Sequence, residues 1–349
     1  MKMLSLPQTS YWKETPFSCK NAPFPYLNTT TKYYNTRTPT LPISLSLIWS
    51  SRKKQTTNSN AHTLLRASFS DSDSVQKQEE EQVEEEEYQV LSAVRSMYND
   101  IVIVDTAKSR VLLLDSTHNV HSILNKGQKW TGSYWDEFAS LPAIIPKGPI
   151  AILGLGGGTA AHLMLDLWPS LQLEGWEIDP ILIDKAREYF GLADLEKHTT
   201  AGGILDVHIG DALAPLENGF GKYAGIIIDL FCEGKVLAQL QEVATWLELN
   251  DRLMPGGRFM VNCGGIDEKL ENENAITNPK SIDWVQNSTV KALSKAFPGQ
   301  VCWKRMPETE AANFLALTGP LPDLTLWSSK IPYPLSETVR EWRPCDSIA

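Results

Sequence analysis

The sequence has few of the residues from which metal centres and disulfide frameworks are built. Its 349 residues include five cysteines, none of them in a Cys-x-x-Cys pair, and six histidines, of which only His118 and His121 stand close together. Paired cysteines are typical of structural zinc sites and of secreted disulfide scaffolds. We therefore expect a protein of a reducing compartment that binds no metal.

Long apolar runs and an excess of basic residues are missing as well. Residues 41–49 are too short and too rich in serine to span a bilayer. The chain has 42 acidic and 32 basic residues, a net charge of −10, which repels nucleic-acid phosphates but tolerates a cationic ligand. We expect a small-molecule substrate, with a cationic amine as one option, and neither a nucleic-acid nor a membrane partner. The sequence leaves a homodimer open.

The N-terminal part differs in composition from the rest. Residues 1–70 carry nine basic residues and one acid, Glu14, among many serines and threonines. This composition is typical of an organellar transit peptide and favours the chloroplast stroma over the mitochondrion; a plain disordered tail is the alternative. Residues 71–87 are acidic and polar and predict a solvated linker. Without the first 70 residues the chain has a net charge of about −18.

Ordered sequence begins near residue 88 with a short β pattern. Residues 88–95, 101–105 and 110–115 are apolar runs, the last two joined by a small polar turn. So few strands cannot form a full core. We expect residues 88–140 to form a small β domain that packs against a larger one.

The larger domain, residues 141–319, alternates strands and helices, which predicts a parallel sheet covered on both faces. The expected strands cover residues 149–155, 171–178, 205–209, 223–230 and 258–262, and the expected helices cover residues 159–168, 180–190, 236–253 and 282–297, with a short helix after Asp211. Residues 301–306 and 313–318 have no helix between them and predict an antiparallel pair at one edge. The predicted fold is α/β: a doubly wound, Rossmann-like, mostly parallel seven-stranded sheet with an antiparallel edge strand, followed by an extended tail at residues 320–349.

A glycine-rich turn follows the first strand of this domain. Its glycines allow a ligand to approach the backbone, and the helix start behind them offers free N–H groups. About twenty residues later Glu177 ends the second strand, where a carboxylate can hold both hydroxyls of a ribose. Plain strand-to-helix connections also contain glycine, but Glu177 favours a nucleoside site. The expected turn residues at this site are Gly154, Gly156, Gly158 and Thr159.

The glycine turn alone does not show which type of nucleotide binds. The pattern Gly156-x-Gly158-x-x-Ala161 also fits a dinucleotide site, and so an NAD-dependent oxidoreductase. Asp211 ends the third strand, well placed to accept a hydrogen bond from an adenine amino group. A ribose acid and an adenine acid suit S-adenosylmethionine or its decarboxylated form, which has no pyrophosphate to neutralise. We favour that ligand as the co-substrate.

The order of the motifs resembles the spermidine synthase-like proteins, the aminopropyltransferases, within the class I methyltransferase superfamily, as a divergent plant-type chloroplast member. The resemblance covers residues 88–318 and rests on residues 112–119, 134–138, 156–161, 177–179, 210–212, 226–229 and 253–257. It implies that Glu177 holds the ribose and Asp211 the adenine, and that Asn119 stands where the family has a ligand-binding Gln. It also implies that Asp229 is the catalytic acid, and a strand-end carboxylate there can act as a general base on an amine. A turn-capping role is the alternative for Asp229.

Several positions depart from the family pattern. Thr159 replaces the acid of the glycine turn, and the stretch after Asp229 keeps the first family acid but loses the second. Asp136 and Glu233 are candidates to replace lost carboxylates, while Tyr134 and Trp246 are candidates to line the same substrate pocket. Ordinary helix packing is the alternative for Trp246.

Three functions therefore remain open. The first is aminopropyl transfer from decarboxylated S-adenosylmethionine to an amine, as in polyamine biosynthesis. The second is methyl transfer from S-adenosylmethionine to an unidentified small molecule, which the lost acids favour. The third is a ligand-binding protein without catalysis.

Overall fold

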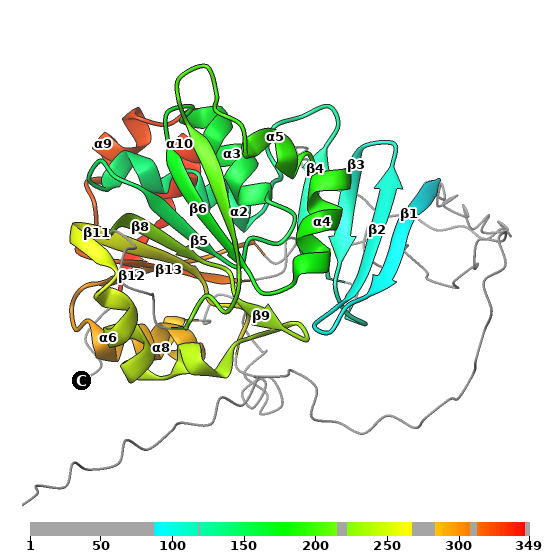
Figure 1. Ribbon diagram of the computed structural model, residues 1–349. Helices are drawn as coiled ribbons and strands as arrows, with labels where there is room; N and C mark the ends of the chain where they lie inside the picture. The colour runs from blue at the N-terminus through cyan, green and yellow to red at the C-terminus, as the bar shows by residue number, and fades with distance from the viewer. Residues whose placement is uncertain (1–86, 118, 215–221, 267–282, 308–312, 346–349) are drawn as a thin grey trace, which may run out of the picture. The chain divides into compact units, whose positions relative to one another are not determined.

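Two main β-sheets and the helices packed on them make up the described chain (Figure 1). The computed structural model describes residues 87–117, 119–214, 222–266, 283–307 and 313–345. All of them belong to one compact unit, Pro42–Ala349. The expected transit peptide, nearly all of the acidic linker and His118 lie outside the described residues, so the chloroplast location stays a prediction. None of the described helices is long and apolar enough to cross a membrane.

The smaller sheet is antiparallel, with its strands in sequence order. It consists of β1 (Tyr88–Arg95), β2 (Asp100–Thr106), β3 (Ser109–Leu113) and β4 (Ser122–Asn125). In β2, Ile101 and Ile103 are fully buried and Val102 between them is not, because successive side chains of a strand point to opposite faces. The sequence pattern did not predict β4, the strand that reaches the glycine turn of the larger domain.

The larger sheet confirms the predicted doubly wound fold. Its strands are β5 (Ile150–Leu153), β6 (Gln172–Glu177), β7 (Ile204–Ile209), β8 (Tyr223–Ile228), β11 (Leu253–Asn262), β12 (Val301–Arg305), β13 (Phe314–Thr318) and β14 (Arg343–Pro344). They lie in the order β14-β12-β13-β11-β8-β5-β6-β7. The strands from β11 to β7 are mutually parallel, and β13, β12 and β14 pair antiparallel at the other edge. The short β14 is an eighth strand beyond the seven predicted.

The strand order reverses beside β5. The chain builds β5, β6 and β7 outward in one direction, and then returns to place β8 on the other side of β5. In such sheets ligands bind at the carboxyl ends of the strands at this reversal. Both the glycine turn after β5 and Asp229 after β8 lie there.

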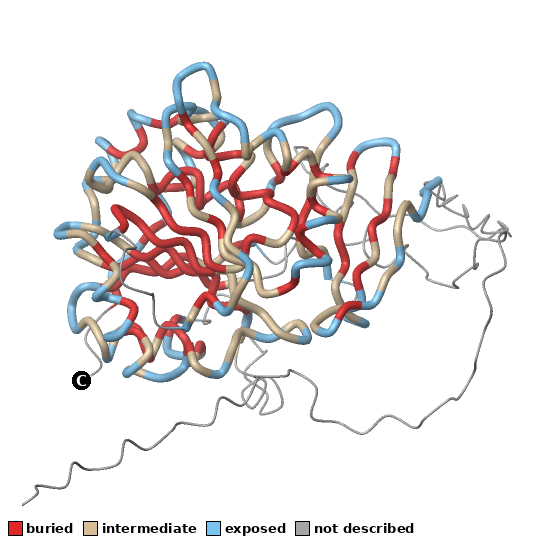
Figure 2. The backbone as a smooth tube through the Cα atoms, viewed as in Figure 1, coloured by how far each residue is buried: buried red, intermediate tan, exposed pale blue. Residues whose placement is uncertain are grey.

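Helices cover both faces of the larger sheet (Figure 1). One face is packed by α2 (Tyr134–Phe138), η1 (Leu141–Ile144), α3 (Thr159–Leu167), α4 (Pro180–Tyr189) and α5 (Leu192–Leu195), and the other by η2 (Ala238–Gln241), α6 (Val243–Asn250), η5 (Trp284–Gln286) and α8 (Ser288–Ala296). Ile227 of β8 belongs to the first core cluster, and its neighbours Ile226 and Ile228 belong to the second. Figure 2 shows the central strands buried along their length.

The helix expected over residues 236–253 is wrong in its extent. The chain forms β9 (Phe231–Cys232), β10 (Lys235–Val236), η2 and α6, with an extended backbone at Glu242 between the last two. Leu240 and Trp246 are both fully buried in the same cluster. Six residues apart, they would point about 240° apart around a continuous helix, so the break allows both side chains to enter the core.

The C-terminal part is also more structured than the predicted extended tail. It contains α9 (Leu324–Ser329), α10 (Leu335–Thr338), η7 (Val339–Glu341) and β14. Trp327 and Trp342 are 1% and 2% exposed and lie with their ring centroids 6.1 Å apart. The two indoles supply enough apolar area to hold a short helical segment on the sheet.

A fully buried carboxylate joins the small sheet to the larger domain. Asp179 caps α4 with Oδ1, which accepts hydrogen bonds from the N–H groups of Ile181 and Leu182. Its Oδ2 accepts from Ser96 Oγ at 2.5 Å and from Asn99 Nδ2 at 2.8 Å. The residue that starts α4 therefore also fixes the β1–β2 turn.

The second joint lies at the glycine turn itself. Thr159 Oγ1 accepts a hydrogen bond from Ile123 N at 2.9 Å and donates one to Ile123 O at 3.0 Å. Gly157 N donates to Ser122 Oγ at 2.7 Å. Since Thr159 is 4% exposed, these bonds are shielded from water, and β4 is tied to the first turn of α3.

Replacing Thr159 with valine should destabilise the protein by about 1–3 kcal/mol, because it leaves two buried backbone groups of Ile123 without their partner. Urea unfolding of the full chain would measure the loss. Thr159→Ser keeps the hydroxyl and serves as the control. Equal stability of the valine and serine variants would show that the Thr159 hydroxyl does not hold β4.

Candidate active site

Asp229 directly follows β8 and lies against the glycine turn. Its N–H donates to Leu153 O at 2.9 Å. A Cβ at Gly154 would come within 2.2 Å of the Asp229 carbonyl oxygen, and Gly154 has a φ of +88°. Only glycine both adopts this φ readily and has no Cβ to collide with the carbonyl. The glycine therefore allows the turn to lie this close to Asp229.

Two neutral donors hold the Asp229 carboxylate. Asn262, at the end of β11, donates from Nδ2 to Oδ1 at 2.9 Å, and Tyr134 of α2 donates from its hydroxyl to Oδ2 at 3.2 Å. The Asn262 oxygen already accepts from Gly264 N at 3.2 Å and from Asn313 Nδ2 at 3.0 Å. The amide nitrogen is therefore the end that faces Asp229.

The environment makes Asp229 a carboxylate that titrates close to neutral pH. Burial raises the pKa of Asp229 to about 6, and the hydrogen bonds from Asn262 and Tyr134 limit the rise. Burial and the Asp229 charge raise the pKa of Tyr134 well above its usual value, so Tyr134 stays a donor. At pH 7 and above Asp229 is mostly ionised, as a general base must be.

His121 is a second titratable group near Asp229, and its charged form lowers the pKa of Asp229. Its Nε2 lies 3.5 Å from Asp115 Oδ2, and the two side chains are 18% and 15% exposed. Burial opposes ionisation of Asp115, but hydrogen bonds from His121 and Thr117 outweigh it and lower the pKa of Asp115 to about 2. The result is a histidine beside a firmly ionised carboxylate.

Sequence reasoning did not assign Asn262 and His121 to the site. A signal for Asn262 was present, because it is a polar residue that ends an apolar strand beside the strand of Asp229. His121 precedes β4, the strand that was not predicted. No local sequence pattern therefore indicated that His121 lies next to the site.

Glu177 ends β6 on the other side of the turn. Its Oε2 accepts from Gly156 N at 3.0 Å, and its Oε1 accepts from Ile178 N at 3.0 Å and from Asp179 N at 3.2 Å. Burial raises the pKa of Glu177, and these N–H donors oppose the rise. Oε1 accepts two of these bonds and Oε2 one, so Oε2 keeps a lone pair with which the fixed side chain can still accept from a ribose hydroxyl.

Asp211 follows β7, next to Glu177. The two strand ends adjoin, since Gly210 N donates to Glu177 O at 2.9 Å. Asp211 is exposed, and its Oδ1 accepts from Leu213 N at 2.9 Å. The structure thus brings Asp211, Glu177, the glycine turn and Asp229 to the carboxyl ends of adjacent strands, as the sequence predicted.

Three residues expected at the ligand or substrate are used inside the protein. The Thr159 hydroxyl is taken by the Ile123 backbone. Asp136 is 6% exposed and accepts from the N–H and hydroxyl of Thr131 and from Gly132 N, at 2.8–3.0 Å, so it fixes the loop before α2. Trp246 is fully buried and donates to Leu240 O at 2.9 Å. These contacts favour structural roles for Thr159, Asp136 and Trp246, and their expected ligand and pocket roles stay predictions.

Glu233 and Asn119 lie at an exposed rim. Glu233 has a φ of +51° in the tight turn between β9 and β10, and its side chain is exposed. At the adjacent Gly234, a Cβ would lie 2.9 Å from Thr117 Cγ2 and 3.5 Å from Asn119 Nδ2. The hairpin that follows Asp229 therefore packs on the loop that carries Asn119, while the ligand roles of Glu233 and Asn119 stay predictions.

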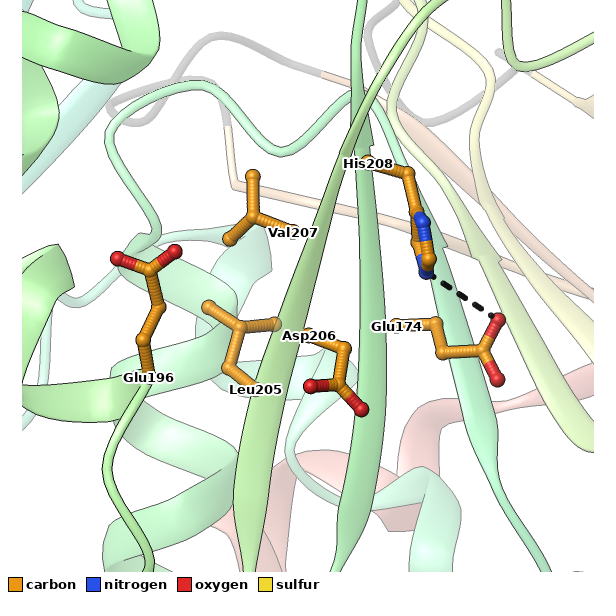
Figure 3. A pocket seen from close by; sticks show the side chains of 6 residues that line it. All are labelled: Glu174, Glu196, Leu205, Asp206, Val207 and His208. Atoms are coloured by element: carbon orange, nitrogen blue, oxygen red, sulfur yellow. Dashed lines mark ion pairs between the residues drawn. The ribbon is translucent and has the colours of Figure 1, made fainter.

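A separate cavity of about 430 Å³ lies at the β7 edge of the sheet (Figure 3). It is lined by Glu174, Glu196, Leu205, Asp206, Val207 and His208. Glu174 lies 3.7 Å from His208 Nε2 and accepts from Tyr223, and Glu196 binds Arg187 through both oxygens. Its charges are largely paired within the protein, and its lining includes no residue of the predicted site.

Comparison with known proteins finds relatives of this chain that are named for polyamine aminopropyl transfer. No protein-family model matches it. It is 28% identical over 217 residues to a probable polyamine aminopropyl transferase of Bifidobacterium longum, covering 58% of this chain and 46% of that protein. It is 27% identical over 129 residues to a polyamine aminopropyltransferase of Vibrio vulnificus, covering 36% of this chain and 41% of that protein. The chain thus spans about half the length of these curated relatives or less.

Shorter and more distant similarities include methyltransferases. A trans-aconitate 2-methyltransferase of Streptomyces coelicolor is 38% identical over 72 residues, 21% of each chain. Among solved structures, a probable spermidine synthase of Corynebacterium glutamicum matches with a TM-score of 0.48 and 17% identity, over 65% of this chain and 79% of that one.

Replacing Tyr134 with phenylalanine should raise the pKa of Asp229 above 6 by about one unit, because the ionised carboxylate loses a hydrogen-bond donor. NMR titration of protein labelled at the aspartate carboxyl carbons measures the shift, and Asp229→Asn identifies the signal. The exposed Tyr333, replaced by phenylalanine, is the control. An unchanged or lower pKa of Asp229 would show that Tyr134 does not donate to it.

Proposed function

We propose that this chain, a relative of the spermidine synthase-like proteins, transfers an aminopropyl group from decarboxylated S-adenosylmethionine to an amine. The observation that carries the proposal is Asp229: a half-buried carboxylate held by Asn262 and Tyr134 beside the glycine turn, with its pKa raised to about 6. The similarity to two proteins named for polyamine aminopropyl transfer supports the same reaction.

The chemistry requires little beyond positioning. The carbon attached to a sulfonium sulfur is electrophilic, and the amine nitrogen forms a bond to it while the carbon–sulfur bond breaks. The electron pair of that bond stays on sulfur, which leaves as a neutral thioether. The ionised Asp229 holds the amine in line and takes up the proton that the nitrogen loses.

The nucleoside would bind beside this carboxylate. Glu177 would accept from a ribose hydroxyl through the remaining lone pair of Oε2, with a side chain already fixed by three backbone N–H groups. Asp211 is exposed at the next strand end and accepts from the adenine amino group. With these two contacts, the ligand would be held at the same sheet edge as the glycine turn and Asp229.

One structural feature favours methyl transfer from S-adenosylmethionine as the second candidate. A binding site for the ammonium end of an aminopropyl group needs carboxylates. The turn carries Thr159 in place of an acid, and Asp136 is used by its own loop. The match to a methyltransferase over 72 residues agrees with this alternative.

Calorimetric titration separates these functions. We expect the protein to bind decarboxylated S-adenosylmethionine more tightly than S-adenosylmethionine, and Glu177→Ala to weaken the binding of both because the ribose contact is lost. Asp206→Ala, at the separate cavity, is the control. Tighter binding of S-adenosylmethionine would favour methyl transfer, and binding of neither would refute both enzyme functions.

Replacing Asp229 with asparagine should lower kcat by about 10²–10⁴-fold, the usual contribution of a general base, and leave the affinity for the nucleoside ligand nearly unchanged. In the unchanged protein, the rate should fall about tenfold per pH unit below the pKa of about 6, because only the ionised carboxylate accepts a proton. Steady-state rates with a diamine acceptor between pH 5 and 8 test both expectations. A parallel loss of affinity and rate in Asp229→Asn would assign this residue a structural role.

A further inference from the structure

We infer that a buried ion pair between Glu137 of α2 and Lys304 of β12, which residues of the C-terminal segment 324–345 contact, positions α2 and Tyr134 for the active site. This inference extends the proposed function, since it concerns what holds the donor to Asp229. Lys304 and Glu137 are positioning residues and do not contact the substrate.

The ion pair is almost completely buried, and its contacts join three separate elements of the fold. Lys304 of β12 and Glu137 of α2 are each 2% exposed, with Nζ and Oε1 2.7 Å apart. Lys304 Nζ also donates to Thr338 O of α10 at 2.8 Å and lies 3.3 Å from Glu341 of η7. Trp342 Nε1 donates to the other Glu137 oxygen at 3.4 Å.

Burying two charges is a poor way to gain stability. The cost of removing both from water is of the same size as their attraction, and apolar side chains of similar volume often serve as well or better. The buried pair can still fix one geometry, because a displaced partner would leave an unpaired charge in the core. Its location therefore points to a role in holding α2 at one position.

α2 depends on such outside contacts. It has five residues, and Ser133 at its N-terminus makes no capping hydrogen bond through its side chain. A helix of this length is not stable by itself. Indole groups hold the chain just after it: Trp168 donates to Ala139 O at 2.9 Å, and Trp327 of α9 donates to Ser140 O at 3.1 Å.

Tyr134 transmits the position of α2 to Asp229. It lies three residues before Glu137 on the same short helix, and its ring packs on Trp135 and Phe138 with centroids 4.5 and 5.6 Å away. The Tyr134 hydroxyl is 3.2 Å from Asp229 Oδ2, at the long end of a hydrogen bond. A small movement of α2 is therefore enough to break it.

The test replaces the pair by apolar side chains of similar length, Glu137→Met with Lys304→Met, in the full chain. We expect the variant to fold and the pKa of Asp229 to rise, as we predict for Tyr134→Phe. Adding Tyr134→Phe to the pair variant should then produce no further shift, because the hydrogen bond is already lost. The matched control is Lys126→Met, which removes the 2.7 Å ion pair to Asp105 in the small sheet.

A folded pair variant with an unchanged pKa of Asp229, or a full additional shift from Tyr134→Phe, would overturn the inference. If the pair variant does not fold, Trp327→Phe decides the question, since it removes one hydrogen bond and keeps an aromatic ring. A smaller shift in the same direction supports the inference, and no shift refutes it.

The NMR titration needs no turnover, so its result stands apart from the proposed function. If aminopropyl transfer is measured, the pair variant should also lower kcat at least tenfold while the KM for the nucleoside ligand stays within twofold, because Glu177 ends β6, Asp211 follows β7 and neither lies on α2. A KM that rises as much as kcat falls would indicate a general structural defect and count against the positioning role.

Discussion

The contact between Gly154 and the carbonyl of Asp229 is the constraint on which the candidate site depends. It joins β5 and β8 at the point where the strand order reverses, and it leaves no room for a side chain. The turn that would receive the nucleoside and the carboxylate that would receive the proton are therefore neighbours by backbone geometry. Asn262 and Glu177 then extend the site along the strands on either side.

The small sheet contributes directly to the turn. Ser122 accepts from Gly157 N, and Thr159 bonds both backbone groups of Ile123, so the turn is held in shape by protein contacts. The same bonds give a structural role to Thr159, which stands where the resemblance implies an acid. A threonine there can join the two sheets, but it offers no charge to a ligand. The threonine that departs from the family pattern thus connects β4 to the start of α3.

The C-terminal segment has a comparable relation to the other side of the site. Trp327 and Trp342 contact the chain around α2, and Lys304 brings a buried charge to Glu137. Tyr134, the donor to Asp229, lies on that helix. Two regions distant in sequence therefore support the site. β4 supports the glycine turn, and residues 324–345 support the helix whose Tyr134 donates to the Asp229 carboxylate.

Sequence patterns alone predicted most strands and helices of the doubly wound sheet, the glycine turn, and the placement of Glu177, Asp211 and Asp229 at neighbouring strand ends. These features depend on local periodicity, on turn residues and on the rule that parallel strands end at one edge. Which polar groups are already paired became visible only in the folded structure. Asp136 and Trp246 bind their own surroundings, Asn262 faces Asp229, and Lys304 reaches Glu137 across 167 residues, because such contacts follow from packing between distant segments, which no local pattern records.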